Sequence, residues 1–306
     1  MLAVTAGLVT LQTFDAPTLA QQSLAAALGV LLAVGLAVRT GGQVTLPTVL
    51  ALVVGVAAVA TQWAPLLAGA ALGTAVLAAC LGVFATRPAA TALAVVREVV
   101  VAVLVAAAGG IAASGFSVGI DRERFTHSVL VVAVAATVAL AYRLGGGLHG
   151  LGRRGLLLVA GALVLLVVVL VYTAALTRYG SPELIAHVRS AHDWTREHLG
   201  GVPHPVEVLV GVPALAWGVS VRARRRQGWW VCVFGTAATA HLAGDLVGRT
   251  DTALSSALGA VYGLVLGLLL GAVVIRLERA LTGRDQHPGE HALDVRVEPS
   301  RQQALH

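Results

Sequence analysis

Two ionisable side chains, His241 and Asp245, stand four positions apart near the end of an apolar run, in the stretch TAATAHLAGDLVGR of residues 236–249. In a helix this spacing places both side chains on one face. There the carboxylate can hold the tautomer of the imidazole, or both groups can ligate a cation. His127, at the end of DRERFTH, lies near the mouth of another apolar run. The sequence therefore predicts a polar pocket built around His127, His241 and Asp245.

The composition around these groups is typical of a polytopic membrane protein. Of the 306 residues, 57% are hydrophobic and 12% are charged, and the mean hydropathy is +0.85. A spanning helix needs about 20 mostly apolar residues, and the sequence predicts an all-α bundle of about nine of them within a bundle domain of residues 1–275. The predicted spans are 20–38, 45–63, 65–86, 94–114, 128–143, 155–177, 205–221, 228–247 and 254–275.

The two ends of the chain differ from the bundle. Residues 1–12 are apolar but too short to cross a membrane, so we expect an interfacial or re-entrant segment. The alternative, a signal peptide, lacks the positive region that would precede its apolar stretch. Residues 276–306 are polar and contain Pro and Gly, and we expect a cytoplasmic tail that is largely disordered beyond about residue 282.

The arginines predict the orientation, because cytoplasmic loops hold the excess of basic residues. With the N-terminus outside and the C-terminus inside, all but six of the 21 basic residues, which are all Arg, fall on the inner side. The six on the outer side are Arg122, Arg124, Arg178, Arg189, Arg196 and Arg249. This arrangement predicts a multi-pass protein of the cell membrane.

The formal net charge of +6 needs no nucleic-acid partner, because basic inner loops face anionic lipid. The densest basic cluster, Arg222, Arg224, Arg225 and Arg226, is expected to face lipid. The absence of Lys excludes a Schiff base, and with it retinal chemistry, as well as a phosphate-binding P-loop.

The outer segment 178–204 predicts an amphipathic helix over about 182–199. Ser181 can cap it with Pro182 at its first position, and Gly200 can end it. Trp194 would lie at the headgroups. The helix could form a lid over the pocket, and its candidate lid residues are His187, His192, Asp193, Glu197 and His198.

The last predicted span carries a small residue at every fourth position, which leaves one face almost without side chains. Such a face lets a neighbouring helix approach closely. The neighbour is either another part of the chain, a second copy or another membrane subunit. The residues of this face are Ser255, Gly259, Gly263, Gly267 and Gly271.

One family resemblance adds an enzymatic hypothesis. FTHSVL of residues 125–130, followed by HLAGD of residues 241–245, is similar to the LexA-regulated, membrane-bound metal-dependent hydrolases. The resemblance covers about a dozen residues and rests on Thr126, His127, Ser128, His241 and Asp245. Arg122 and Glu123 stand where that family has its first His and Arg, and its acidic stretch is absent. The resemblance implies metal-assisted hydrolysis at the outer leaflet, with His127, His241 and Asp245 holding Zn or Mn and activating a water.

Three classes of function follow. We expect first a protein that handles a small molecule or a lipid through an outward-facing polar pocket, in the manner of a facilitator or permease, without a cofactor. The first alternative is the metal-dependent hydrolase. The second is an accessory or structural subunit that packs through the glycine face of the last span.

Overall fold

The structure is a computed structural model of the chain. It describes residues 1–13, 17–117, 119, 121–144, 182–223, 228–247, 253–282 and 300–305, with isolated positions between 157 and 171. Every regular element within these residues is helical. The helices are α1 (Leu2–Thr13), α2 (Thr18–Arg39), α3 (Thr45–Thr61), α4 (Ala64–Phe84), α5 (Ala92–Ser114), α6 (Arg122–Arg143), α8 (Pro182–Leu199), the short π-helix η2 (Glu207–Gly211), α9 (Val212–Arg222), α10 (Gly228–Asp245) and α11 (Ala253–Thr282).

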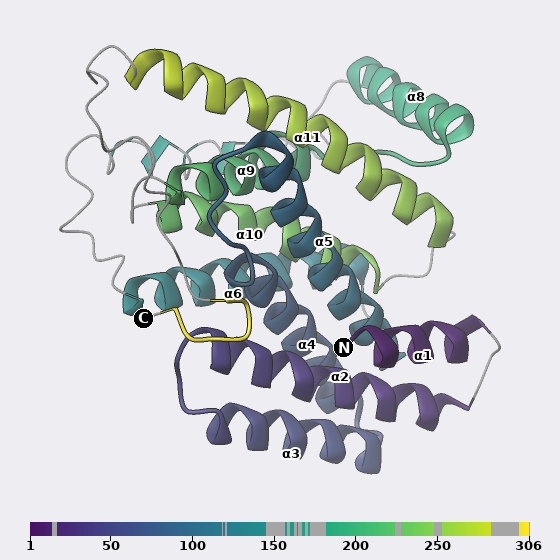
Figure 1. The fold of residues 1–306 in the computed structure, drawn as a ribbon. Helices are drawn as coiled ribbons and strands as arrows, with labels where there is room; N and C mark the ends of the chain where they lie inside the picture. The colour runs from purple at the N-terminus through teal and green to yellow at the C-terminus, as the bar shows by residue number, and fades with distance from the viewer. Residues whose placement is uncertain are drawn as a thin grey trace.

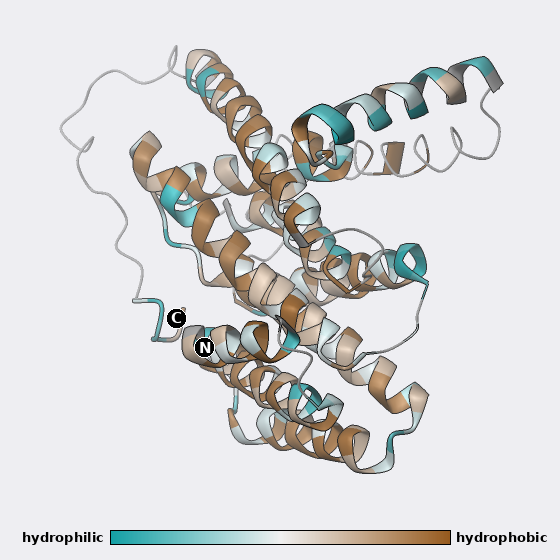
Figure 2. Ribbon diagram, turned by 90° about the vertical axis from the view of Figure 1, so that its right-hand side faces the viewer, coloured by the Kyte–Doolittle hydropathy of each residue, from teal (hydrophilic) through white to brown (hydrophobic). Residues whose placement is uncertain are grey.

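The helices confirm the predicted fold class, an all-helical membrane protein. Five helices in the described part of the chain, α2, α4, α5, α6 and α11, are long and apolar enough to cross a membrane. Figure 2 shows hydrophobic residues along most of the helices and hydrophilic residues gathered mainly at helix ends and in loops. The helices α3, η2 with α9, and α10 coincide with further predicted spans, while the predicted span 155–177 lies outside the described helices.

Residues 2–13 form α1, which packs against α2 and α5. Leu8 is fully buried. The side-chain amide of Gln12 donates to the hydroxyl of Ser114 at the end of α5, over 3.1 Å. The segment predicted to be interfacial or re-entrant is therefore a short helix attached to the bundle.

Helix α10 lies inside the bundle and packs against α4, α5, α6 and α9 (Figure 1). Small side chains make this position possible, because its Ala237, Ala240 and Ala243 are fully buried. The buried hydroxyl of Thr239 donates to the Ala79 carbonyl of α4 over 3.0 Å. The first turn of α10 reaches one polar region of the molecule, and its last turn reaches another.

The glycine face of α11 lies against residues 201–216 of the same chain. A Cβ at Gly259 would lie 2.7 Å from the Val202 carbonyl oxygen, and one at Gly267 would lie 2.5 Å from Cβ of Val212. Gly271 faces Pro213 and Ala216 in the same way. The face is thus packed within the chain along η2 and α9.

At the start of α10 lies a cluster of charged and polar side chains, most of them buried, which we call the arginine cluster: Arg39, Thr86, Glu98, Arg222 and Arg301. Arg39, Glu98 and Arg222 are fully buried. Arg222 donates to the Thr86 hydroxyl over 2.8 Å and lies 3.5 Å from the ring centroid of Trp229. The prediction that Arg222 faces lipid is therefore wrong, because its guanidinium is held between α9, α10 and the end of α4; Arg224, Arg225 and Arg226 lie outside the described residues.

Residues 300–305 also belong to this region, although the sequence places them in the polar tail. Arg301 donates to both carboxylate oxygens of Glu98, over 2.6 and 2.7 Å. Arg39 donates to the Ser300 and Gln303 carbonyl oxygens over 2.7 and 3.1 Å. The expectation of a disordered tail therefore does not hold for these six residues, because buried charges at the helix ends supply partners for their backbone.

Candidate functional site

The opposite end of α10 brings the predicted pair His241 and Asp245 against α6. The contact depends on Gly244, because a Cβ there would lie 2.9 Å from Cα of Thr126. This close approach sets the first turn of α6 beside the last turn of α10. Arg122 consequently lies next to Asp245, although 123 residues separate them in the chain.

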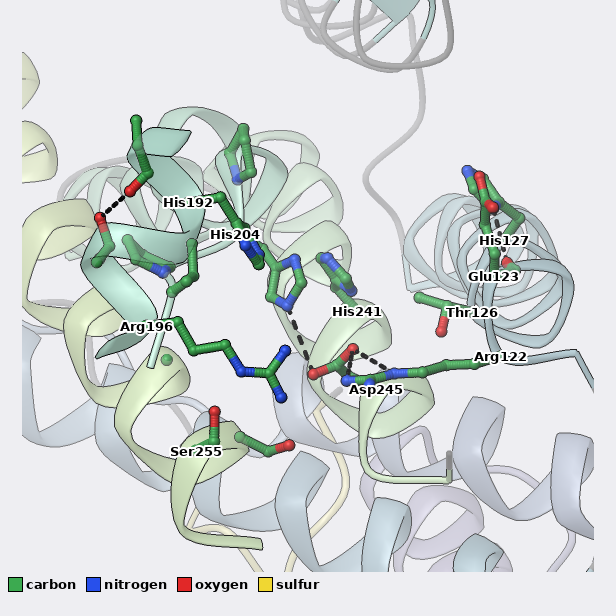
Figure 3. Close-up of a pocket in the computed structure, with 17 residues that line it drawn as sticks. Arg122, Glu123, Thr126, His127, His192, Arg196, His204, His241, Asp245 and Ser255 are labelled. Atoms are coloured by element: carbon green, nitrogen blue, oxygen red, sulfur yellow. Dashed lines mark hydrogen bonds and ion pairs between the residues drawn. The ribbon is translucent and has the colours of Figure 1, made fainter. Parts of the chain in front are cut away.

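Asp245 is held by two basic groups from two other segments. Nε of Arg122 donates to its Oδ1 over 3.0 Å. Nε2 of His204, which precedes η2, lies 3.5 Å from its Oδ2. The carboxylate therefore ties α6, α10 and the 202–205 segment together, and both contacts are drawn in Figure 3.

A cavity of about 730 Å³ opens beside this carboxylate. Residues of α6, α8, α10, α11 and the 202–205 segment line it. Figure 3 shows Arg196 of α8 reaching into this space toward Asp245 and His204, with Ser255 of α11 below. We call this cavity the histidine pocket, because His127, His192, His204 and His241 all line it.

Two buried polar atoms on the wall of the histidine pocket have no hydrogen-bond partner among the residues that the structure describes: the hydroxyl oxygen of Thr126 and Nδ1 of His241. The imidazole of His241 lies against that of His204, with ring centroids 4.1 Å apart. Buried polar atoms in folded proteins are nearly always satisfied by protein, water or ligand. Such atoms on the wall of a large cavity indicate a binding site.

A third unpartnered atom lies deeper, on Glu207 of η2. This side chain is only 2% exposed, and its Oε1 has no hydrogen-bond partner within the described ranges. The carboxyl group rests on Gly263 of α11, where a Cβ would lie 2.7 Å from its Cδ. A small cavity of about 10 Å³, lined by Glu207, His204, His241, Asp245 and Ser256 among others, connects this carboxyl region with the wall of the histidine pocket.

The structure places the predicted pocket residues in different parts of this site. His241 and Asp245 lie together at its centre, whereas His127 lies at the rim, on the side of α6 that carries Glu123 (Figure 3). Nδ1 of His127 is 2.7 Å from the Glu123 carbonyl oxygen. The three side chains therefore do not converge on one point.

Metal ligation by these residues has no geometric support. Within the part of the chain that the structure describes, no group of three or more His, Cys, Asp or Glu side chains is arranged to hold a metal ion. Asp245 is instead engaged by Arg122. His127, His241 and Asp245 all line the histidine pocket.

The amphipathic helix is present with the predicted bounds, as α8 from Pro182 to Leu199. Gly200 ends it with a φ of +74°, a left-handed conformation that favours glycine. The hydroxyl of Tyr262 in α11 donates to the Leu199 carbonyl over 2.8 Å. These contacts fix the C-terminal end of α8 on α11.

Of the five candidate lid residues, only His192 lines the histidine pocket. His187 and His198 are exposed, and each has its Nδ1 within 2.9 Å of a backbone carbonyl one turn earlier. Asp193 and Glu197 are exposed as well. The helix covers the cavity mainly through Ala191, His192, Thr195 and Arg196.

Sequence reasoning missed Arg122, Arg196, His204 and Glu207 as parts of the site. The signal for Glu207 was present, because an ionisable residue inside an apolar segment is a functional candidate by default. His204 stands between Pro203 and Pro205, which fix the backbone there but do not reveal its partner. Arg122 and Arg196 carry no local signal, because only long-range packing brings them to the histidine pocket.

Comparison of the chain with known protein families, with curated proteins and with solved structures finds no match.

Proposed function

We propose that this multi-pass membrane protein binds a small molecule or a lipid headgroup in the histidine pocket and handles it in the manner of a facilitator or permease. The carrying observation is the 730 Å³ cavity whose wall holds two buried, unpartnered polar atoms, on Thr126 and His241. A volume of this size is within the range of about 300–1,000 Å³ that is usual for small-molecule sites.

The lining groups favour a ligand with an anionic part. Arg122 and Arg196 bring guanidinium groups to the pocket, and Thr126, Ser255 and other hydroxyl side chains lie around them. Guanidinium and hydroxyl groups are preferred donors to phosphate and carboxylate. A phosphate or carboxylate group, free or on a lipid, fits this arrangement.

The position of the pocket in the membrane follows from the arginine distribution. If the arginine-rich loops are cytoplasmic, the end of α10 that carries Asp245 faces the outer side of the cell membrane. Helix α8 then lies over the outer opening, and it is fixed to α11 near Leu199. Its Thr195 and Arg196 would move with it if it opened.

Native mass spectrometry of the detergent-purified protein with a short-chain phosphatidylglycerol tests the proposal. We expect one bound phospholipid per chain and about tenfold weaker binding in Arg196→Ala, because a charge-assisted hydrogen bond contributes about 1.5 kcal/mol or more. Arg189→Ala is the matched control, since Arg189 is exposed on the same helix and is not a lining residue.

Equal binding by the wild type, Arg196→Ala and Arg189→Ala would contradict a phospholipid site in the pocket. Inorganic phosphate as a competitor then separates a headgroup site from an acyl-chain site, since it displaces lipid only from the former.

Metal analysis of the same samples tests the hydrolase alternative: stoichiometric zinc or manganese that is lost in His241→Ala would favour it.

A further inference from the structure

A small cavity lies beneath the histidine pocket. It is lined by both Glu207 and His241, the two side chains with buried unpartnered atoms in this region. Its volume of about 10 Å³ is close to the minimum that a single water molecule requires. The cavity therefore suits one water or one small cation.

The shape of η2 directs Glu207 into this place. The backbone N–H of Val212 donates to the Glu207 carbonyl, five residues earlier, which is the widened turn of a π-helix. Pro213 follows and has no N–H with which to continue the regular pattern. Such single wide turns occur often at functional sites, and here the turn sets the carboxyl on the bare surface of Gly263.

The charged and titratable groups around Glu207 come from only some of its neighbours. From α10 these are His241 and Asp245, and from the preceding segment His204. Arg122 of α6 lies behind Asp245 and is paired with it. Helix α11 contributes Ser256, Ala260 and Gly263, which carry no charge.

The groups that line the small cavity determine which small cation it can hold. Calcium, magnesium and similar hard cations take oxygen ligands, whereas two imidazoles line this cavity. Transition metals suit imidazole and carboxylate, but three converging ligands are not found among the residues that the structure describes. A proton needs only a carboxylate or an imidazole and a water between them.

We propose that Glu207 and His241 form a buried proton-exchanging pair beneath the histidine pocket, so that binding of an anionic ligand above is accompanied by a change in the protonation of this pair. The inference rests on the proposed function for its coupling to a ligand. The pair itself exists independently of which ligand binds. An ionised carboxylate without a partner is costly in such surroundings, and a proton that Glu207 shares with His241 removes that cost.

Infrared difference spectroscopy of the full-length protein in lipid, recorded as the pH is stepped, tests the pair without any ligand. A protonated carboxylic acid has a C=O stretching band of its own, at higher frequency when the oxygen accepts no hydrogen bond. We expect such a band to titrate in the wild type, to be absent in Glu207→Gln, and to titrate with a different midpoint in His241→Ala. The control is His187→Ala, because His187 is exposed on α8 away from the pocket.

A titrating band that survives in Glu207→Gln, or a midpoint that is the same in His241→Ala and the wild type, overturns the pair. If Glu207→Gln does not fold, the comparison of His241→Ala with His187→Ala still decides the question. Short-chain phosphatidylglycerol is then added: a shifted midpoint supports the coupling, and an unchanged midpoint with lipid bound overturns it. Absence of lipid binding with a normally titrating pair would reject the proposed function alone.

Discussion

The two ends of α10 reach two polar regions that satisfy their buried groups differently. In the arginine cluster, Arg39 and Glu98 are fully buried and have several partners at 2.6–3.4 Å. In the histidine pocket, atoms of Thr126 and His241 are equally buried but have no hydrogen-bond partner in the described part of the chain. A buried polar network that is satisfied contributes to a unique, rigid structure, whereas one that is incomplete leaves room for a ligand or water.

The two regions also differ in what fills them. Residues 300–305 supply carbonyl groups and Arg301 to the arginine cluster, so that Arg39 and Glu98 find partners within the chain. The histidine pocket contains a cavity of about 730 Å³ beside Asp245. We therefore expect substitutions in the first region to change stability and those in the second to change binding.

The largest effect is expected for Arg39→Ala. Its guanidinium donates to the carbonyl oxygens of Phe84, Ser300 and Gln303, so the substitution leaves buried acceptors unpaired and opens a cavity. We expect a loss of about 3 kcal/mol in the free energy of unfolding, measured by titration with a denaturing detergent. Arg189→Ala, on the exposed face of α8, serves as control, and equal stability of the two variants would contradict the structural role of the cluster.

Gly259→Ala should have the next largest effect. The new Cβ would lie 2.7 Å from the Val202 carbonyl oxygen, which is backbone and cannot rotate away, and overpacking of this kind costs about 2 kcal/mol. Gly69→Ala is the matched control, because nothing lies within 4 Å of a Cβ there. We expect that control to be stabilised by about 0.5 kcal/mol; destabilisation of both variants to the same extent would show that the close contact is not the cause.

Arg301→Ala should cost less, because its side chain is 35% exposed although its partner Glu98 is fully buried. A hydrogen bond to a charged group, discounted for solvent, gives about 1 kcal/mol. Arg97, which donates to Glu98 over 2.9 Å, remains as a partner of the carboxylate. Thermal unfolding followed by Trp fluorescence should show a small decrease in Tm that is absent in Gln302→Ala, which alters an exposed neighbour.

The smallest change in stability is expected for Thr126→Val. This variant separates most clearly an effect on binding from an effect on stability. The Thr126 hydroxyl has no hydrogen-bond partner among the described residues, so its removal should leave stability within about 0.5 kcal/mol of the wild type. Thr239→Val removes a hydroxyl that donates to Ala79 and should cost about 1 kcal/mol. Phospholipid binding should be weakened in Thr126→Val and unchanged in Thr239→Val; the reverse pattern would contradict a ligand at the histidine pocket.

Much of the secondary structure could be predicted from the sequence. The bounds of α8 follow from Pro182, Gly200 and the amphipathic pattern between them, because helix ends depend on local backbone chemistry. The lengths of the apolar runs predict most of the other helices, for the same local reason. The role of Arg222 could not be predicted in this way: its sequence neighbours indicate a lipid-facing loop, but Thr86, 136 residues away in the chain, and Trp229 of the next helix hold it inside.

Composition, apolar periodicity and capping residues by themselves determined that this is an all-helical membrane protein and that His241 and Asp245 share one helix face. Only the tertiary structure decided that Arg122 and His204 hold Asp245, that His127 lies apart from it, and that Glu207 rests on Gly263. The physical reason is the range of the interactions concerned. Helices form from contacts within about four residues, whereas a pocket depends on close approaches such as Gly244 on Thr126, which depend on how whole helices pack.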